Sequence, residues 1–474
     1  MDLSEYLSLD AIDIVRLINT GEVSATEMVE CAVRRLDLVE PKINAFSFLT
    51  IDKAYTDAAA IDALRCRGGK LPPFAGVPFS VKDLISVADV PYCFGSKAYA
   101  DNIGKIDAPS VDRLRAAGGL MLGKTTTAEL GTKALGDSPL TGLTRNPINL
   151  SKTTGGSSAG AAASIAAGVS PVALGTDAGG SVRIPGAMTG IFAIKPQFGR
   201  IPVFPRSATP EMSHVGPMTR SVKDAALMMD LISGPDSRDP NSLFPMTGSF
   251  LAECYREPRP LRIAWSPTLG YAKADTEMLV VLSSALKCFE SWGCKIDEIE
   301  APLGPDTADA WSIMYYALIA TNLGEKLQKY ENEIDPYSIN LLKHGLQPQI
   351  GDYCKSLLVK RALHDRLIDL FSKYDLLLTP TIPIPSFETG LQVPPGFEDR
   401  NAVTWACYTY PFNLSGNPAA SIPVGCDTSG FPIGLQVVAP MHCEDRIFNV
   451  CAALENLMPW QKVRQLDIEL EYAG

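Results

Sequence analysis

The sequence is poor in the side chains that form metal sites and disulfide frameworks. It has four histidines, and none of its eleven cysteines stands in a CxxC pair. Scattered cysteines without ligand spacing are typical of reduced thiols, so we expect neither a disulfide framework nor a zinc site. The N-terminal stretch MDLSEYLSLD is acidic and lacks the basic start of a secretory signal. Together these features predict a cytoplasmic protein.

The sequence also lacks an excess of positive charge and a long uninterrupted hydrophobic run. Its 53 acidic and 42 basic residues give a net charge of −11, which argues against nucleic acid or an anionic membrane as partner. The longest run of small apolar residues, 159–175, is broken by serine, glycine and proline, so it is not a membrane span. With 46% hydrophobic residues, the chain has ample material for a globular core.

The order of periodic segments predicts an α/β fold. Residues 9–66 have helical spacing with turn signals at Thr20-Gly21 and Glu40-Pro41, which predicts two or three N-terminal helices. After Pro72, short β-like runs alternate with helical segments such as 110–117, which favours a sheet with parallel strands. The β-like runs are 77–81, 120–122, 172–174, 191–194, 261–265, 376–379 and 434–439. Because there is no internal repeat or low-complexity linker, we expect one compact domain.

The most unusual segment is 154–185, TGGSSAGAAASIAAGVSPVALGTDAGGSVRIP. Its two serine clusters, Ser157-Ser158 and Ser181, lie 24 residues apart, and each directly follows Gly-Gly. Glycine allows a ligand to approach the main chain closely. A serine after such a turn can present its hydroxyl beside free backbone N–H groups, which acyl transfer requires. The segment therefore predicts a serine hydrolase.

The turn before Ser181 has a second interpretation. The N–H groups of Ala178, Gly179, Gly180 and Ser181 could converge on one point and stabilise an oxyanion. Alternatively, the glycines only form a turn and Ser181 caps a helix. The local sequence leaves both interpretations open.

A serine nucleophile needs a base, and the sequence offers two. His214, in SHVGP, is the one histidine that suits a triad, because the other three lie in charged helical surroundings or a predicted loop. Lys82, in GVPFSVKDL, follows an apolar run, and a salt bridge to Asp83 is the alternative interpretation. A lysine with a pKa of about 10.4 is almost fully charged at pH 7. It can act as a base only if burial lowers that pKa, by up to roughly 3–5.

Two further motifs match other classes of protein. The segment Gly118 to Thr125 satisfies GxxxxGK[ST], the phosphate-binding loop, although its GLML reads as a buried strand. The segment 156–160 satisfies GxSxG, which would make Ser158 the nucleophile of a Ser-His-Asp α/β-hydrolase. The preceding NLSKTT is polar and loop-like, whereas that elbow follows an apolar strand. A nucleotide binder and an α/β-hydrolase stay open as alternatives.

Three motifs, GVPFSVKD, TTGGSSAG and GTDAGGSVRIPGAMTGIFAIKP, resemble those of the amidase signature family in the same order and at the same spacing. The similarity continues through 216–240 and into TYPFNLSGNPAASIPVG and GFPIGLQVVAP. One departure is Ser158-Ala159-Gly160, where Ser-Gly-Gly is common. The resemblance implies the amidase signature fold, a central mixed twisted β-sheet with helices on both faces. It further implies one domain over 1–474, made of an N-terminal helical segment (1–66), a catalytic core (72–240), a variable, mostly helical substrate-side region (245–370) and the C-terminal part of the sheet (371–474).

The resemblance also implies a Ser–cis-Ser–Lys triad. Ser181 would be the acyl-enzyme nucleophile, Ser157 the relay that follows a non-proline cis peptide, and Lys82 the base. The implied enzyme cleaves a small-molecule carboxamide without a metal or cofactor, and similarity leads us to expect a homodimer. Some relatives are instead glutaminase subunits of tRNA-dependent amidotransferases, which require companion subunits.

The sequence also offers candidates for the residues that contact the substrate. We expect Gly131 and Thr132 near the substrate, together with the aromatic segment 311–319. Trp405 and Tyr408 are further candidates for contacts with an aryl or alkyl group. Core packing explains each of these side chains equally well.

Overall fold

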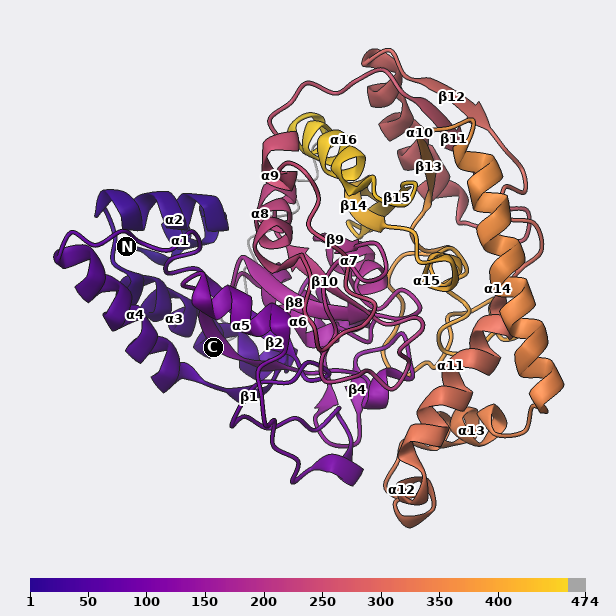
Figure 1. The fold of residues 1–474 in the computed structure, drawn as a ribbon, viewed down its shortest axis with the longest axis horizontal. Coiled ribbons are helices and arrows are strands. Elements are labelled where there is room, and N and C mark those ends of the chain that lie inside the picture. Colours follow the sequence, from indigo (N-terminus) through magenta and orange to yellow (C-terminus); the bar gives the residue numbers. More distant parts are fainter. Residues whose placement is uncertain (459–474) are drawn as a thin grey trace.

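The computed structural model describes residues 1–458 (Figure 1). Its strands are β1 (Phe46–Leu49), β2 (Pro78–Lys82), β3 (Leu120–Thr125), β8 (Val172–Asp177), β9 (Phe192–Lys195), β10 (His214–Thr219), β11 (Arg262–Trp265), β12 (Lys295–Glu298), β13 (Leu376–Pro380), β14 (Ala419–Cys426) and β15 (Pro432–Val438). They form one 11-stranded sheet in the order β1-β3-β2-β8-β10-β9-β14-β15-β13-β11-β12. Strand β2 pairs in parallel with β3 and β8, and β10 pairs antiparallel with β8 and β9. The sheet is therefore mixed, as predicted.

Helices cover this sheet. They are α1 (Leu3–Ser8), α2 (Ala11–Thr20), α3 (Ala25–Ile43), α4 (Ile51–Cys66), α5 (Pro109–Ala116), α6 (Ala159–Ala166), α7 (Arg183–Thr189), α8 (Val222–Ile232), α9 (Phe250–Glu253), α10 (Thr276–Ser291), α11 (Ala308–Leu323), α12 (Glu325–Lys329), α13 (Pro336–Gly345), α14 (Ile350–Phe371), α15 (Pro411–Ser415) and α16 (Glu444–Leu457). Every residue of β2, β3, β9, β10 and β15 is buried. Successive residues of a strand point to opposite faces, so both faces of these strands are covered. The predicted α/β fold with helices around a central mixed sheet is confirmed.

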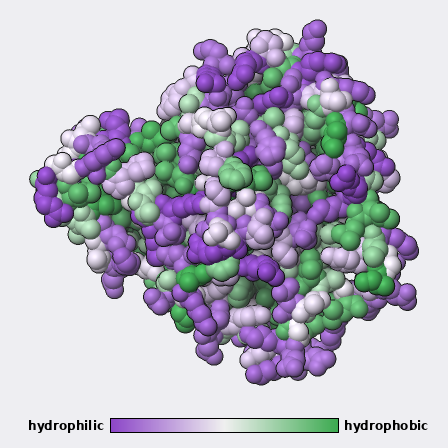
Figure 2. Space-filling model, viewed as in Figure 1, coloured by the Kyte–Doolittle hydropathy of each residue, from purple (hydrophilic) through white to green (hydrophobic). Residues whose placement is uncertain are grey.

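Figure 1 shows α1–α4 at one end of the molecule and α11–α14 at the other. Two small hairpins, β4 (Asp137–Ser138) with β5 (Gly142–Leu143) and β6 (Arg145–Asn146) with β7 (Asn149–Thr153), lie outside the central sheet. Figure 2 shows hydrophilic residues spread over the face in view, with smaller hydrophobic groups between them. Among residues 1–458, no helix is both long and apolar enough to cross a membrane. The division into segments stays a prediction, and residues 459–474 of its last segment lie outside the described residues.

The N-terminal prediction is partly confirmed. Helix α2 ends at Thr20, and Gly21 caps it in the left-handed conformation, as the turn signal predicted. The turn predicted at Glu40-Pro41 is wrong, because α3 continues through Pro41 to Ile43. Burial of Ile43 in the core outweighs the cost of a proline in the last helical turn. The prediction also missed β1, a short strand at the edge of the sheet.

Helix α6 carries the motif serines at its N-terminal end and packs closely against the sheet. All but the last of its residues, AGAAASIA, are buried, and small side chains let its backbone approach β8 and β10. The closest approach is at Gly160, whose N–H lies 3.2 Å from the carbonyl oxygen of Thr126. A Cβ atom at Gly160 would collide with the Ala45 carbonyl oxygen and lie 2.6 Å from the Thr126 nitrogen.

We expect the substitution Gly160→Ala to destabilise the protein by about 1–3 kcal/mol, because the added methyl group overpacks backbone that cannot move aside. The matched control is Gly351→Ala, also at the second position of a helix, where a Cβ would meet no atom within 4 Å. That control should be neutral or stabilising by up to about 1 kcal/mol, because alanine favours helix. Thermal unfolding of both variants measures the difference. Equal melting temperatures would contradict the close packing described here.

Candidate active site

The ends of two parallel strands bring the predicted site residues together. Strand β2 pairs in parallel with β8, so the carboxyl ends of both strands lie at the same edge of the sheet. Lys82 is the last residue of β2, and Asp177 is the last of β8. This edge is where open α/β sheets commonly bind ligands.

Lys82 is completely buried at this edge. Its Nζ lies 2.7 Å from Ser157 Oγ, 2.9 Å from Ser158 Oγ and 3.3 Å from the carbonyl oxygen of Thr176. Burial lowers the pKa of Lys82 well below its ordinary value, and the negative charge of Asp177 opposes this only in part. The salt bridge predicted as the alternative, to Asp83, is not the arrangement found. This environment therefore favours the neutral form of the amine.

The segment before α6 places Ser157 and Ser158 around Lys82. The peptide bond between Gly156 and Ser157 is cis, the geometry that the family resemblance implied. The backbone N–H of Ser158 donates to the carbonyl oxygen of Ser181 at 3.1 Å, which joins the two serine clusters. Ser157 and Ser181 line the same cavity. The structure thus brings Lys82 and both predicted catalytic serines to one place.

Residues 178–181, the Ser181 turn, follow β8. Ser181 is 8% exposed, and α7 begins two residues later with Val182 as its cap, so Ser181 does not cap that helix. Gly180 has a φ of 128°, which favours glycine. Its N–H donates to Asp177 Oδ1 at 2.8 Å, so it is not free for a ligand. Within the described chain, the N–H groups of Ala178, Gly179 and Ser181 have no acceptor, which leaves three of the four predicted donors.

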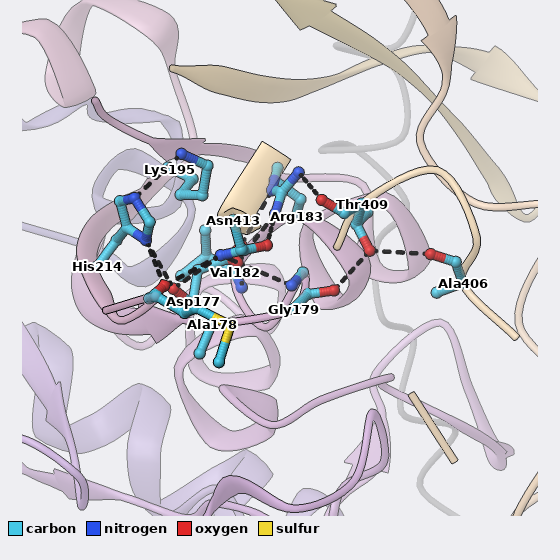
Figure 3. Close-up of polar contacts among 12 residues, drawn as sticks. Asp177, Ala178, Gly179, Val182, Arg183, Lys195, His214, Ala406, Thr409 and Asn413 are labelled. Atoms are coloured by element: carbon cyan, nitrogen blue, oxygen red, sulfur yellow. Dashed lines mark hydrogen bonds and ion pairs between the residues drawn. The ribbon is translucent and has the colours of Figure 1, made fainter. Parts of the chain in front are cut away.

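A buried polar cluster holds the Ser181 turn from the side opposite the cavity (Figure 3). The Asp177 carboxylate accepts hydrogen bonds from Arg183 Nη2 at 2.9 Å and Nε at 3.0 Å, and from Asn413 Nδ2 at 2.8 Å. Burial alone would raise the pKa of Asp177, but the Arg183 charge and these hydrogen bonds hold it well below the usual range. Thr409 Oγ1 donates to the carbonyl oxygen of Gly179 at 2.6 Å. The turn is therefore fixed through both its backbone and Asp177.

His214 belongs to this cluster and not to the cavity. Ser213 and Val215 line the cavity, whereas the His214 ring contacts Asp177 and Lys195. Its ring is therefore placed on the other side of the Ser181 turn. The histidine interpretation of the base does not agree with this position.

The cavity beside the serines has a volume of about 280 Å³. Aromatic and apolar side chains dominate its lining, namely Leu84, Ile85, Tyr92, Phe94, Tyr99, Ala108, Leu130, Pro202, Val203, Phe204, Pro205, Ala208, Tyr315, Ile319 and Leu323, with Ala178 and Val215. Its polar lining comes from Ser86, Ser157, Thr176, Ser181, Ser207, Thr209, Ser213 and Asn322. Arg206 is the one charged residue among the described residues that line it.

The predicted substrate contacts are found only in part. Gly131 lies beside Ser157, because a Cβ atom on it would be 3.5 Å from Ser157 Oγ. The N–H groups of Gly131 and Thr132 donate within their own turn, and the Thr132 hydroxyl contacts Ser338 at 2.7 Å outside the cavity lining. The aromatic segment 311–319 does contribute to the lining, through Tyr315 and Ile319.

Trp405 and Tyr408 are fully buried and do not line the cavity. Sequence reasoning missed two walls, 84–99 and 202–209, which provide most of the lining. The aromatic residues after Lys82 and the prolines of 202–205 were the available signals for these walls. Taken alone, the aromatic residues indicate a hydrophobic core and the prolines indicate a loop.

The two alternative motifs have other roles. The segment Gly118 to Thr125 leads into and forms β3, so it is no phosphate-binding loop. The Nζ of Lys124 donates to the Ile85 carbonyl oxygen at 2.6 Å and lies 3.4 Å from the Asp83 carboxylate. Ser158 follows β7, a strand of a small hairpin and not of the central sheet, and its hydroxyl contacts Lys82 instead of lining the cavity. The polar segment predicted as a loop before it is thus a strand.

Within residues 1–458, no group of three or more histidine, cysteine, aspartate or glutamate side chains is arranged to hold a metal ion. The groups that the site does contain are an amine, hydroxyls and backbone N–H groups. Such a set can activate an alcohol nucleophile and stabilise an oxyanion.

Comparison with known proteins gives consistent results. A family model described as amidase matches residues 27–448. The chain is 35% identical to an acylamidase of Rhodococcus erythropolis over 97% of both chains. It is 31% identical to a glutamyl-tRNA(Gln) amidotransferase subunit of Chromohalobacter salexigens, over 94% of this chain and 96% of that one. The crystal structure of a bacterial aryl acylamidase of the amidase signature family superposes with a TM-score of 0.90 at 28% identity, covering 96% of this chain and 98% of the other.

Because burial lowers the pKa of Lys82, the stability of the folded protein should depend on pH. The unfolded chain keeps this lysine protonated up to about its ordinary pKa of 10.5, whereas burial in the folded protein lowers that pKa well below this value. The unfolded state then binds more protons, so the contribution of Lys82 to stability increases with pH, by at most about 1.4 kcal/mol per pH unit. The stability of the wild type relative to Lys82→Met should therefore increase between about pH 7 and pH 9.5.

Denaturant unfolding across this pH range measures the effect. The variant Lys105→Met is the control, because Lys105 is exposed. Its difference from the wild type should stay constant with pH. A constant difference for Lys82→Met as well would mean that Lys82 stays charged in the folded protein.

Proposed function

This chain belongs to the amidase signature family, and from that membership we propose that it hydrolyses carboxamides through an acyl-enzyme on Ser181. Ser157 relays the proton of Ser181 to Lys82. The observation that carries the proposal is the buried Lys82 amine, 2.7 Å from Ser157 Oγ in a cavity that Ser181 also lines.

The hydrogen-bond partners of Lys82 support proton transfer from Ser157 to Lys82. A neutral amine has two N–H donors and one lone pair. The Thr176 carbonyl oxygen can only accept, and Ser158 Oγ can accept from Lys82 while its own proton points to that same carbonyl at 3.2 Å. These two acceptors use both donors of the amine. Its lone pair is then left for the hydroxyl proton of Ser157.

The reaction then proceeds in two halves. Lys82 takes the Ser157 proton as Ser157 takes that of Ser181, and Ser181 Oγ attacks the amide carbon. When the tetrahedral intermediate collapses, the C–N bond breaks and the proton returns through Ser157 to the leaving nitrogen. Water then attacks the Ser181 ester by the same relay and releases the carboxylic acid.

The developing oxyanion is stabilised by the Ser181 turn. The N–H groups of Ala178, Gly179 and Ser181 have no acceptor within residues 1–458 and lie beside the nucleophile. Such donors stabilise charge that forms only in the transition state, and each is typically worth about 10²–10³ in rate.

The cavity favours a neutral amide with an aryl or bulky apolar group. Aromatic rings of Tyr92, Phe94, Tyr99 and Tyr315 line it, and no acidic residue does so within the described chain. Burial of apolar surface against such a wall stabilises the complex, whereas a charged group would lose its hydration and find few partners. The relatives named acylamidase and aryl acylamidase agree with this substrate class.

The alternative, a glutaminase subunit of a tRNA-dependent amidotransferase, has the support of the 31% identity to a protein of that kind. Free glutamine, however, carries an ammonium and a carboxylate beside each other. With Arg206 as the one charged lining residue, the described cavity has no carboxylate to pair with that ammonium. An apolar amide is therefore the better fit.

The variants Ser181→Ala and Lys82→Ala should lose at least about 10³-fold in kcat, because each removes an essential part of the relay. Ser157→Ala should lose on the order of 10²–10³-fold and keep a residual activity, since water can transfer the proton less effectively. Amide hydrolysis by purified variants with unchanged melting temperatures measures these losses.

Ser158→Ala is the matched control, because Ser158 contacts Lys82 but does not line the cavity. We expect it to lose about tenfold or less, because the hydrogen bonds of Ser158 to Lys82 and Thr176 only support the proposed base and do not carry the transferred proton. A fluorophosphonate should label Ser181, and mass spectrometry locates the adduct. Labelling of Ser158, or near-normal activity of folded Ser181→Ala, would contradict the assignment.

Substrate preference gives a separate prediction. An aryl amide such as acetanilide or benzamide should exceed glutamine in kcat/KM by on the order of 10²-fold, because ring burial stabilises the complex while the charged glutamine groups lose water without gaining partners. Comparing the two aryl amides tells whether the ring binds on the amine or the acyl side. A kcat/KM for glutamine equal to or above both aryl amides would favour the glutaminase alternative.

A further inference from the structure

The side chains of β8 and β10 next to the Ser181 turn alternate between two environments. Thr176 and Ala178 line the cavity on either side of Asp177, and Ser213 and Val215 do so on either side of His214. Asp177 and His214 are also direct partners in the antiparallel register. Their side chains therefore point together to the face opposite the cavity. Figure 3 shows the His214 ring bonded to the backbone carbonyl oxygen of Asp177.

The surroundings of His214 fix its tautomer. Its Nδ1 lies 2.8 Å from the Met212 carbonyl oxygen and 3.1 Å from that of Asp177, and both oxygens can only accept. Its Nε2 lies 3.3 Å from the Nζ of Lys195, which has N–H groups to donate in its charged and in its neutral form. The same Nζ donates to the Asn417 carbonyl oxygen at 2.6 Å, which fixes its position. His214 therefore carries its proton on Nδ1 and accepts at Nε2.

We propose that His214 is a positioning residue, whose Nδ1–H holds the carbonyl of Asp177 together with Asn413 Nδ2, which donates to the same oxygen at 3.1 Å, and thereby sets the geometry of the Ser181 turn. The inference rests on the proposed function, because it concerns the geometry of that nucleophile and its oxyanion donors. Lys195 acts through His214 by holding the ring in the Nδ1–H tautomer.

The position of the Asp177 carbonyl bears directly on the turn. The peptide unit that contains this carbonyl ends in the N–H of Ala178, the first of the three free donors. A rotation of that peptide moves the donor away from the oxyanion. Misplacement of catalytic groups by about 1 Å can cost on the order of 10²-fold in rate.

Two substitutions of His214 by an amide side chain distinguish the role of Nδ1 from that of Nε2. In His214→Asn the side-chain NH₂ reaches about as far as Nδ1 and can still donate to the Asp177 carbonyl. In His214→Gln the amide reaches the Nε2 region and can accept from Lys195 without serving that carbonyl. Both variants are uncharged and polar, so each is the control for the burial of the other.

We expect His214→Asn to keep kcat within about threefold of the wild type, and His214→Gln to lose about tenfold or more. KM should change less than kcat, because His214 does not touch the cavity. The rate of fluorophosphonate labelling at Ser181 should follow kcat. Equal kcat in both variants, or losses that follow the melting temperature, would overturn the proposal.

A spectroscopic measurement tests the tautomer without any activity. With four histidines in the chain, ¹⁵N-histidine labelling gives few signals, and the one lost in His214→Asn belongs to His214. We expect that signal to show a protonated Nδ1 and an unprotonated Nε2. The opposite tautomer would overturn the proposal even in an active enzyme. A wild type without amidase activity but with the expected tautomer would instead contradict the proposed function.

Discussion

The removal of one amine from water is the constraint on which the rest of this site depends. Lys82 stands at the end of a strand that is buried over its whole length, and it meets only hydroxyls and a carbonyl. A charged ammonium in this position would lack a carboxylate partner at hydrogen-bond distance among the described residues. Burial therefore lowers the pKa of this amine well below its ordinary value, and the proposed base depends on that shift. The fold buries Lys82 by placing β2 between β3, which is buried throughout, and β8, of which only Thr176 is partly exposed.

Preorganisation of the Ser181 turn comes from the opposite side of the sheet edge. One carboxylate, Asp177, binds Arg183, Asn413 and the N–H of Gly180, and these hydrogen bonds fix the backbone of the turn. Charge inside this cluster is balanced locally between Asp177 and Arg183. The cavity face carries no such charge pair among the residues that the structure describes. The residues that line the cavity and the buried ion pair that supports the turn thus lie on different faces of the sheet.

The sequence was informative where chemistry requires particular residues at particular spacings. Both glycine-flanked serine clusters and the lysine after an apolar strand could be read directly, and the structure places them together. Elements whose conformation depends on contacts with residues far away in the chain could not be predicted from the sequence. Helix α3 passes through Pro41 because Ile43 is buried, and the short strand β1 depends on pairing with β3. The walls 84–99 and 202–209 consist of ordinary apolar and aromatic residues, so only their packing reveals that they enclose a cavity.

The source of these walls has an evolutionary consequence. The amine and the serines are held by β2, by the start of α6 and by the turn after β8, whereas the enclosing rings come from loops and from α11. Loop and helix side chains can therefore diversify while the reacting atoms keep their mutual geometry. Because of this division, mutations in the walls can change which amides the cavity accepts without moving the residues at the strand ends.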